Sequence, residues 1–335
     1  MRRGIAVALC ILCTLALGLI APARSAPLTK WRHGIIVPKG DAAFLYMAQK
    51  KEFFKEAGLD VEFVPLVSDT DLIRALLAHD IDSMEAYPGS ALVAIDHGAR
   101  LKILGGYLTG VPHVLYVRDN INSAKDLEGK RVAVSAPGDL PQILPMAYML
   151  QNGADPAKVN WVTLGRDSAR FQSLVVGKID ATASNIDFLP LLAGHRDLKV
   201  LVRFSQVLPK FLRLTVITLT ETLERRTDDI TKFSIRYGKG VRYAIAHRDE
   251  TIALMGEIVK GLDPSAGGLI FDTFLKERLI EPDFYISPSQ ILFMEQLNIL
   301  TGRQKQRLPV AQVATYEIQR RVIGALGQYR WKGGP

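Results

Sequence analysis

The chain has 335 residues, 48% of them hydrophobic, with 42 lysines and arginines against 34 acidic residues and a formal net charge of +8. The basic excess is spread along the chain without a run of five or more like charges, so composition does not indicate nucleic-acid binding. Only two cysteines occur, Cys10 and Cys13. After residue 25 the chain therefore has no disulfide and no thiolate metal site.

Residues 1–25 have the features of an export signal. A basic start, Met1-Arg2-Arg3, precedes an uncharged apolar run over 5–20, and small residues suited to cleavage follow in Ala21-Pro22-Ala23 or Ala23-Arg24-Ser25. The alternative is a membrane anchor, but the run is shorter than the roughly 20 residues that a span needs. We therefore predict a signal peptide, whose removal leaves 310 residues with a net charge of +5, enough for two domains.

The first half of the chain alternates between strand and helix patterns. After the apolar run Ile35-Ile36-Val37, Asp41 is placed to begin a helix that Gly58 ends. Strands that alternate with helices at this spacing predict a mainly parallel sheet covered on both faces. The expected elements are helix 42–57, strand 61–67, helix 69–78, strand 81–86, helix 90–97 and strand 101–104.

A second unit opens at residues 127–131 and continues to about Phe204. Between the units, residues 105–112 combine several glycines with a proline, as a segment that crosses between lobes would. A strand is expected over 212–219. The rest is mostly helical and has no counterpart in the first unit, with helices expected over 228–246, 249–260, 289–300 and 310–325.

Landmarks of the first unit recur in the second at a nearly constant separation. Gly40-Asp41 is echoed by Gly138-Asp139, 98 positions later. A helix ended by glycine before a strand occurs at Gly58 and again at Gly153, and the motif Ile81-Asp82 recurs at Ile179-Asp180. The pattern predicts two similar α/β lobes in tandem, with a cleft where they face each other.

The two Gly-Asp pairs stand where a strand's carboxyl end meets a helix N-terminus. Open α/β sheets bind ligands at this position, where free N–H groups and the helix dipole favour acceptors. The alternative is that Asp41 and Asp139 each cap their own helix. Tyr87 and Phe188 follow corresponding strands, and each either stacks on a ligand or belongs to the interface between lobes.

Two charged residues near the expected cleft have open roles. Glu85 either faces the cleft or lies on the sheet surface. Arg213, an isolated cation in an apolar strand, pairs either with a ligand carboxylate or with Asp187, and we favour the internal pair. The six histidines are scattered, and nucleophile-elbow and phosphate-loop motifs are missing, which argues weakly against an enzyme and against a dedicated metal site.

Three phrases resemble the periplasmic solute-binding proteins of sulfonate, taurine, nitrate and thiamine-precursor import systems. They are residues 43–62, residues 75–82 with 91–99, and residues 126–134, and the match in order and spacing extends from about 31 to 245. The resemblance implies a two-lobed α/β fold of the type II periplasmic binding protein class, each lobe a mainly parallel sheet flanked by helices. It also implies capture of a small molecule by hinge closure in the periplasm, delivery to an ABC permease at the inner membrane, a monomer, and no cofactor.

Carried onto this chain, the resemblance gives lobe 1 as residues 28–108, lobe 2 as 109–207, and 208–335 as a return to lobe 1 with C-terminal helices. The ligand loops fall on 39–43, 86–90, 135–140 and 185–188. With Glu85 and Arg213 added, the candidate ligand-binding residues are Lys39, Gly40, Asp41, Ala42, Glu85, Tyr87, Pro88, Gly89, Ser90, Ser135, Pro137, Gly138, Asp139, Asn185, Asp187, Phe188 and Arg213.

These loops are also where the chain departs from its relatives. Relatives commonly read Thr-Gly-Pro-Pro-Pro at positions 86–90 and Trp-Glu-Pro-Trp at 185–188. Four acids here oppose two cations, Lys39 and Arg213, which favours a small organic ligand with hydrogen-bond donors and a flat face, such as an amino-heterocycle, over a bare oxyanion.

The alternative function is an enzyme on the same fold, in thiamine-pyrimidine or menaquinone precursor synthesis. That class asks for a cytosolic chain and, for the thiamine-pyrimidine synthases, a cysteine-rich metal motif. The export signal and the position of the two cysteines favour a binding protein.

Overall fold

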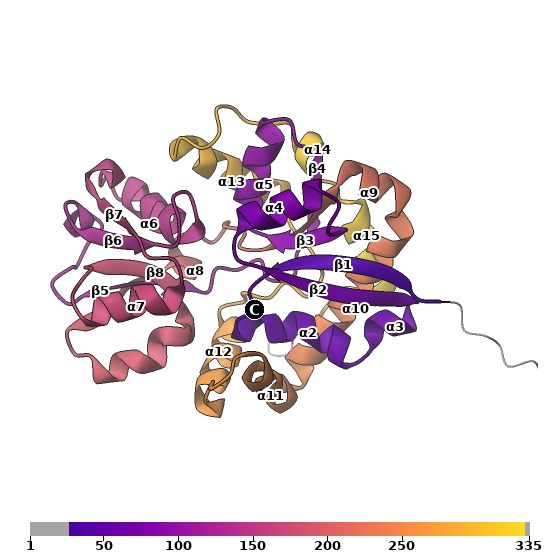
Figure 1. Ribbon diagram of the computed structural model, residues 1–335, viewed down its shortest axis with the longest axis horizontal. Helices are drawn as coiled ribbons and strands as arrows, with labels where there is room; N and C mark the ends of the chain where they lie inside the picture. Colours follow the sequence, from indigo (N-terminus) through magenta and orange to yellow (C-terminus); the bar gives the residue numbers. More distant parts are fainter. Residues whose placement is uncertain (1–26, 332–335) are drawn as a thin grey trace, which may run out of the picture.

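The computed structural model describes residues 27–331, which form two lobes, each built on one five-stranded sheet (Figure 1). The predicted signal peptide, with Cys10 and Cys13, lies outside the described residues. In spatial order, the sheet of lobe 1 contains β2 (Leu59–Leu66), β1 (Thr29–Ile36), β3 (Ser83–Ala86), β10 (Thr215–Leu219) and β4 (Leu101–Gly105). That of lobe 2 contains β7 (Asn160–Thr163), β6 (Arg131–Val134), β8 (Ala181–Asn185), β5 (His113–Arg118) and β9 (Leu198–Arg203).

The two sheets share one topology. Strand β10 in lobe 1 and strand β5 in lobe 2 run antiparallel to both of their neighbours, while the other pairs are parallel. The equivalent positions of β1 and β6, and of β3 and β8, confirm the prediction of two similar, mainly parallel α/β lobes. The carboxyl ends of these four strands carry the predicted ligand loops.

Helices of both lobes follow the strands closely. In lobe 1 they are η1 (Gly40–Ala42), α2 (Ala43–Lys50), α3 (Phe53–Glu56), α4 (Asp69–Leu77) and α5 (Pro88–Asp96). In lobe 2 they are η2 (Lys125–Leu127), α6 (Leu140–Gln151), η3 (Pro156–Lys158), α7 (Asp167–Val175), η4 (Ile186–Gly194) and α8 (Phe204–Val207). Helix α4 illustrates how the sequence starts a helix. The Ser68 hydroxyl accepts a hydrogen bond from the Asp71 N–H, and acidic residues lie in the first turn.

Two predicted helices are broken. Instead of one helix over 42–57, α2 and α3 are separated because Glu52 adopts the left-handed region at φ 57°. Instead of one helix over 310–325, the structure has α14 (Val310–Val313) and α15 (Glu317–Leu326). Between them Thr315 donates its N–H to the carbonyl of Ile103 at 3.0 Å, so this stretch serves the edge of β4 and cannot continue the helix.

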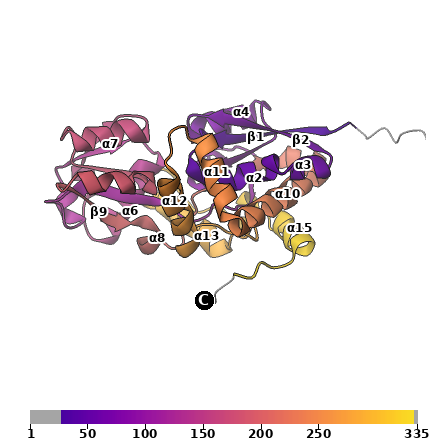
Figure 2. The ribbon, with the colours of Figure 1, turned by 90° about the horizontal axis from the view of Figure 1, so that it is seen from below.

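The C-terminal part is helical and lies with lobe 1 (Figures 1 and 2). Helix α10 packs on α2 and α15, and helix α13 packs on α5. Helix α12 contacts η1 of lobe 1 and η4 of lobe 2. Helix α12 was not predicted, although Asp263 caps it and Pro264 occupies its first turn. The helices are α9 (Thr220–Arg225), α10 (Thr227–Ala246), α11 (Arg248–Ile258), α12 (Pro264–Lys276) and α13 (Pro288–Leu300), followed by α14 and α15. Within residues 27–331 no helix is long and apolar enough to cross a membrane.

Two segments connect the sheets, residues 106–112 between β4 and β5 and residues 204–214 between β9 and β10. They hydrogen-bond to each other, because Arg213 donates its N–H to Thr109 at 3.0 Å and Leu214 donates to Leu108 at 3.1 Å. At Gly110 a Cβ would lie 2.4 Å from the Cα of Leu279, so only glycine fits this close approach. The paired segments place Arg213 at the junction of the lobes.

Candidate functional site

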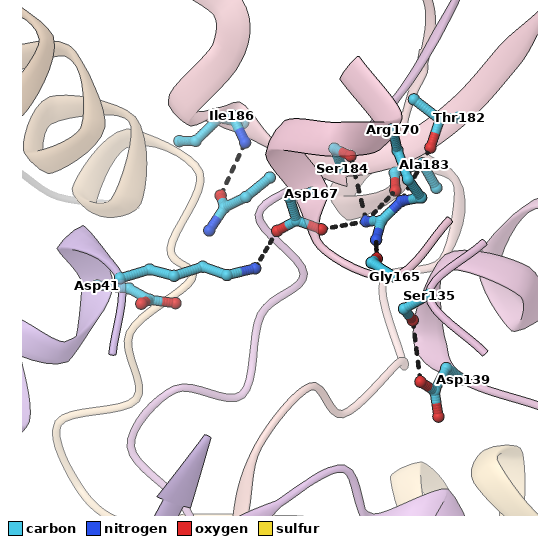
Figure 3. Close-up of polar contacts among 12 residues, drawn as sticks. Asp41, Ser135, Asp139, Gly165, Asp167, Arg170, Thr182, Ala183, Ser184 and Ile186 are labelled. Carbon is cyan, nitrogen blue, oxygen red and sulfur yellow. Dashed lines mark hydrogen bonds and ion pairs between the residues drawn. The ribbon is translucent and has the colours of Figure 1, made fainter. Parts of the chain in front are cut away.

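A lysine of lobe 1 contacts an aspartate of lobe 2 across the junction. Lys39, which follows β1, donates to Asp167, the first residue of α7 (Figure 3). Around this contact lie the residues that we call the interlobe site: Lys39, Asp41, Glu85, His113, Asp167, Arg170, Asn185, Asp187 and Arg213. The site thus joins the loops after β1 and β8 to the start of α7, the start of β5 and the second crossing segment.

Asp167 is fixed within lobe 2 before it meets lobe 1. Arg170 is buried and donates to the Asp167 carboxylate and to the carbonyl of Gly165, and its Nε lies 3.2 Å from the Thr182 hydroxyl (Figure 3). Burial alone would raise the pKa of Asp167, but the Lys39 and Arg170 cations hold it well below its usual range. Asp167 is therefore a carboxylate at any physiological pH.

Arg213 forms an internal ion pair, but its partner differs from the one expected. Its Nη2 lies 2.7 Å from Oδ2 of Asp41, whereas Asp187 was the predicted partner. Asp41 does not cap a helix, since its side chain makes no capping hydrogen bond and is buried in η1. Strand β10 joins the sheet of lobe 1 beside β3, and this brings Arg213, which precedes β10, close to Asp41 in the loop after β1. Sequence spacing does not reveal this pairing.

Several buried polar atoms of the site have no hydrogen-bond partner among the described residues. They are Nε and Nη1 of Arg213, Nδ2 of Asn185, Nδ1 of His113, Oδ1 of Asp187 and Oδ2 of Asp41, the last of which is held only by its ion pair with Arg213. Arg213, Asn185 and His113 are 8%, 1% and 4% exposed. Leaving such a group buried without a partner costs about 1–3 kcal/mol, so a ligand that supplies partners gains affinity here.

Two carboxyl groups of the site have pKa values near neutrality. Burial, reinforced by the nearby Asp41 carboxylate, raises the pKa of Asp187 to about 7. Burial likewise raises the pKa of Glu85 to about 7, although its two hydrogen bonds from the Tyr237 hydroxyl, at 2.9 and 3.0 Å, act in the opposite direction. Of the two positions considered for Glu85, the surface is excluded, since it is 3% exposed on β3. His113 has a pKa well below its usual value, first through burial and then through Arg213.

A second group of charges lies at the same junction, around Arg303 of the C-terminal part. The Arg303 guanidinium is 3.5 Å from the Ser90 hydroxyl of lobe 1 and packs beside Gly138 of lobe 2. Burial raises the pKa of Asp69 to about 6, and it raises the pKa of Asp139 as well. Asp139 stands at the N-terminus of α6 without capping it and accepts instead from the Ser135 hydroxyl at 2.9 Å.

The two aromatic residues are packed against the protein itself. The ring of Tyr87 is 2% exposed and stacks on Phe211 of the second crossing segment, with centroids 5.5 Å apart. Phe188 is half-buried and stacks on Phe171 of α7 at 4.8 Å. Of the two roles considered, interface packing is favoured for Tyr87, whereas the contact of Phe188 lies within lobe 2 and its role stays a prediction.

The remaining predicted residues shape the loops. Gly40 and Ala42 are buried in η1, Pro88 is buried in the first turn of α5, and Pro137 is exposed. Gly89 lies under the Tyr87 ring, and its carbonyl accepts from Asn298 at 2.8 Å. These residues give the loops their shape, and their direct part in binding stays a prediction.

Sequence reasoning missed Asp167, Arg170, His113 and Arg303. Asp167 was accessible, because it lies 98 positions after Asp69, the separation that relates the two Gly-Asp pairs, and each of the two begins the helix after an equivalent strand. Arg170 follows from Asp167 by one helical turn. Arg303 has no counterpart in the repeat and offered no signal.

The described residues contain no group of three or more His, Cys, Asp or Glu side chains arranged to hold a metal ion. Two open hollows of about 290 and 250 Å³ lie on the surface away from the interlobe site, one along 224–229 and one beside β4. Neither is lined by residues of that site. The interlobe site therefore consists of ion pairs and unpartnered polar groups where the two lobes touch.

Replacing Lys39 by methionine is expected to shift the lobes toward a more open arrangement. The lysine is about one-third exposed, so its pair with Asp167 stabilises the contact by about 1 kcal/mol, enough to change the open fraction roughly five-fold. Spin labels on Glu62→Cys and Lys178→Cys, both exposed, would report the interlobe distance. Lys125→Met, which removes an exposed ion pair within lobe 2, is the matched control. Identical distance distributions in Lys39→Met and wild type would contradict the assignment.

Comparisons with known proteins agree with this architecture. SsuA from Xanthomonas axonopodis pv. citri, the alkanesulfonate-binding protein bound to MOPS, is 16% identical with a TM-score of 0.71, covering 87% of this chain and 100% of its own. The periplasmic aliphatic sulphonate binding protein SsuA from Escherichia coli is 17% identical with a TM-score of 0.68, covering 86% and 92%. The periplasmic nitrate-binding protein NrtA from Synechocystis PCC 6803 is 13% identical with a TM-score of 0.69, covering 90% and 89%.

These likenesses confirm the predicted fold class, the two-lobed fold of periplasmic binding proteins. No curated protein sequence matches the chain significantly. The family model described as "NMT1/THI5 like" matches residues 39–251. Because this match covers more than half of the chain, the protein belongs to the NMT1/THI5-like family.

Proposed function

We propose that the protein is the extracytoplasmic solute-binding component of an ABC importer. It captures a small organic solute between its lobes by hinge closure and delivers it to a permease at the inner membrane. The observation that carries this proposal is the interlobe site, where both lobes present buried polar atoms without partners. Within residues 27–331 two hydrogen-bonded segments run between the two sheets, as a hinge requires. The family and the fold of the similar structures support it.

The export signal over residues 1–25 supports a location outside the cytoplasm. In this setting the protein acts as a monomer, since one chain contains both lobes and the complete interlobe site. The enzyme alternative receives less support, because its thiamine-pyrimidine form asks for a cysteine-rich motif and this chain has only Cys10 and Cys13, inside the predicted signal.

The charge balance of the junction supports an organic solute over a bare oxyanion. Among the described residues, six acids gather there, Asp41, Asp69, Glu85, Asp139, Asp167 and Asp187, against four cations, Lys39, Arg170, Arg213 and Arg303. Three of the cations are already engaged by Asp41 or Asp167. Above pH 7, where Glu85 and Asp187 are ionised, an unaccompanied sulfonate or nitrate would meet repulsion from these carboxylates. A solute with hydrogen-bond donors, such as an amino-heterocycle, fits better.

The test is to identify what the exported protein carries. We expect intact-mass analysis of periplasmic protein to show a chain beginning near Arg24 or Ala26. Mass spectrometry of the material released on unfolding should show a small organic molecule in near-stoichiometric amount. An uncleaved cytosolic product would contradict export. Chemical conversion of the bound molecule on the protein would favour the enzyme alternative.

A further inference from the structure

We propose that the interlobe site selects an amphoteric solute, which presents a hydrogen-bond acceptor to Arg213 and Asn185 and an N–H donor to Asp187. This inference rests on the proposed function and names the chemistry that the solute must combine. It goes beyond a preference for donors, because it assigns each side chain one part of the ligand.

The part of the ligand that accepts hydrogen bonds is inferred from two buried donor side chains of the protein. Arg213 uses Nη2 for its ion pair with Asp41, which leaves Nε and Nη1 buried without partners, and each of these two N–H groups can donate to an acceptor of the ligand. From the opposite lobe, the Asn185 side chain has its oxygen occupied by the N–H of Ile186 at 2.7 Å, while its Nδ2 has no partner. The second crossing segment and lobe 2 therefore each offer unpartnered donors to the acceptor part of a ligand.

The part of the ligand that donates a hydrogen bond is inferred from the carboxyl groups of the site. The single O–H of Tyr237 is shared between the two oxygens of Glu85, and Asp167 is engaged by Lys39 and Arg170, so both carboxyl groups already have donors within the protein. Asp187 is different, because its Oδ1 is buried without a partner and the carboxyl group lies within the electrostatic reach of Asp41 and Arg213. An N–H group, neutral or cationic, satisfies it.

Neither half alone satisfies the site. Above pH 7, where Asp187 is ionised, a solute with acceptors only would leave its buried Oδ1 unpaired, and a solute with donors only would leave Nε and Nη1 of Arg213 unpaired. Sites built to hydrogen-bond a polar group reject analogues that lack it, because their own polar groups are then left unpaired. We expect about 10- to 100-fold weaker binding for each missing group.

Calorimetry at pH 8, where Asp187 is ionised, with two matched sets of probes tests the proposal. The first set is 4-aminopyrimidine, pyrimidine and aniline; the second is taurine, ethanesulfonate and ethylamine. In each set the first compound has both groups and the others have one. The exported protein, freed of retained molecules by unfolding and refolding, should bind the complete compound of at least one set 10- to 100-fold more tightly than both of its partial analogues.

Variants then test whether Asp187 is the residue that accepts the N–H group of the ligand. Asp187→Asn should reduce the difference between the complete compound and its acceptor-only analogue to less than about three-fold, and Asp197→Asn, at an exposed ion pair of the same lobe, should leave it unchanged. Equal binding of complete and acceptor-only probes would overturn the proposal. If no probe binds, the molecule retained by the protein decides: one with acceptors only overturns this proposal alone, and one with both groups supports it. If the protein neither retains nor binds any solute, both this proposal and the proposed function fail.

Discussion

Replacing Arg213 by methionine is expected to destabilise the protein by about 3–5 kcal/mol at pH 8, because it leaves the Asp41 carboxylate buried without its counter-charge. Removing Arg213 also takes away a cation that favours the ionised form of Asp187, whose pKa is raised by burial and then by Asp41. Methionine keeps most of the buried volume, so packing contributes little to the change. Urea unfolding followed by circular dichroism measures it.

A double variant separates the charge effect from the loss of the arginine itself. Asp41→Asn with Arg213→Met removes both charges, and we expect it to recover most of the lost stability. Arg118→Met, which breaks an exposed ion pair with Asp197 in lobe 2, should cost at most about 1 kcal/mol. A loss below 1 kcal/mol in Arg213→Met, or no recovery in the double variant, would show that the pair is not an isolated buried one.

Replacing Asp187 by asparagine is expected to stabilise the ligand-free protein above pH 7. The pKa of Asp187 is about 7 in the folded protein against an ordinary 3.8, so between these values the folded state binds the proton that the unfolded state has lost. The stability that Asp187 contributes is therefore present below pH 4 and is lost as the pH rises toward 7. Three pKa units correspond to about 4 kcal/mol, which asparagine, having no titration, does not lose.

The measurement is the unfolding free energy of Asp187→Asn relative to wild type from pH 4 to pH 8. The advantage of the variant should grow along this range to about 4 kcal/mol, whereas Asp197→Asn should show no such growth. A difference that stays constant with pH would contradict the burial of this carboxyl group. The same variant weakens the proposed binding, which is the usual relation between a strained site and its function.

The sequence predicted the architecture because the repeat is carried by local patterns. Strand and helix periodicities, and glycines that end helices, recur at a separation of 95 to 98 residues, and the equivalent positions Ile81 and Ile179 are both buried in their lobes. A repeated pattern of this kind folds into repeated sheets, so two lobes of one topology follow. The antiparallel strand of each sheet was harder to place, because β5 and β10 each follow a segment that crosses between the lobes.

The partners within the site could not be predicted by the same reasoning. Asp41 had donors nearby in its own helix, and local geometry favoured a cap, but the folded chain brings Arg213 to it from 172 residues away. That choice depends on the antiparallel position of β10. Arg303 reaches the junction from a C-terminal part that has no repeat, so nothing in the sequence indicated it. The composition of the loops was predictable, and their pairing was not.

The measurement that tests the central claim most directly is small-angle scattering of the exported protein with its retained solute and after the solute has been removed. If the solute binds between the lobes and closes them about residues 106–112 and 204–214, the radius of gyration should rise when the solute is removed and return to the smaller value when the identified compound is added back. An unchanged scattering profile at saturating solute would contradict closure of the lobes around a ligand at the interlobe site.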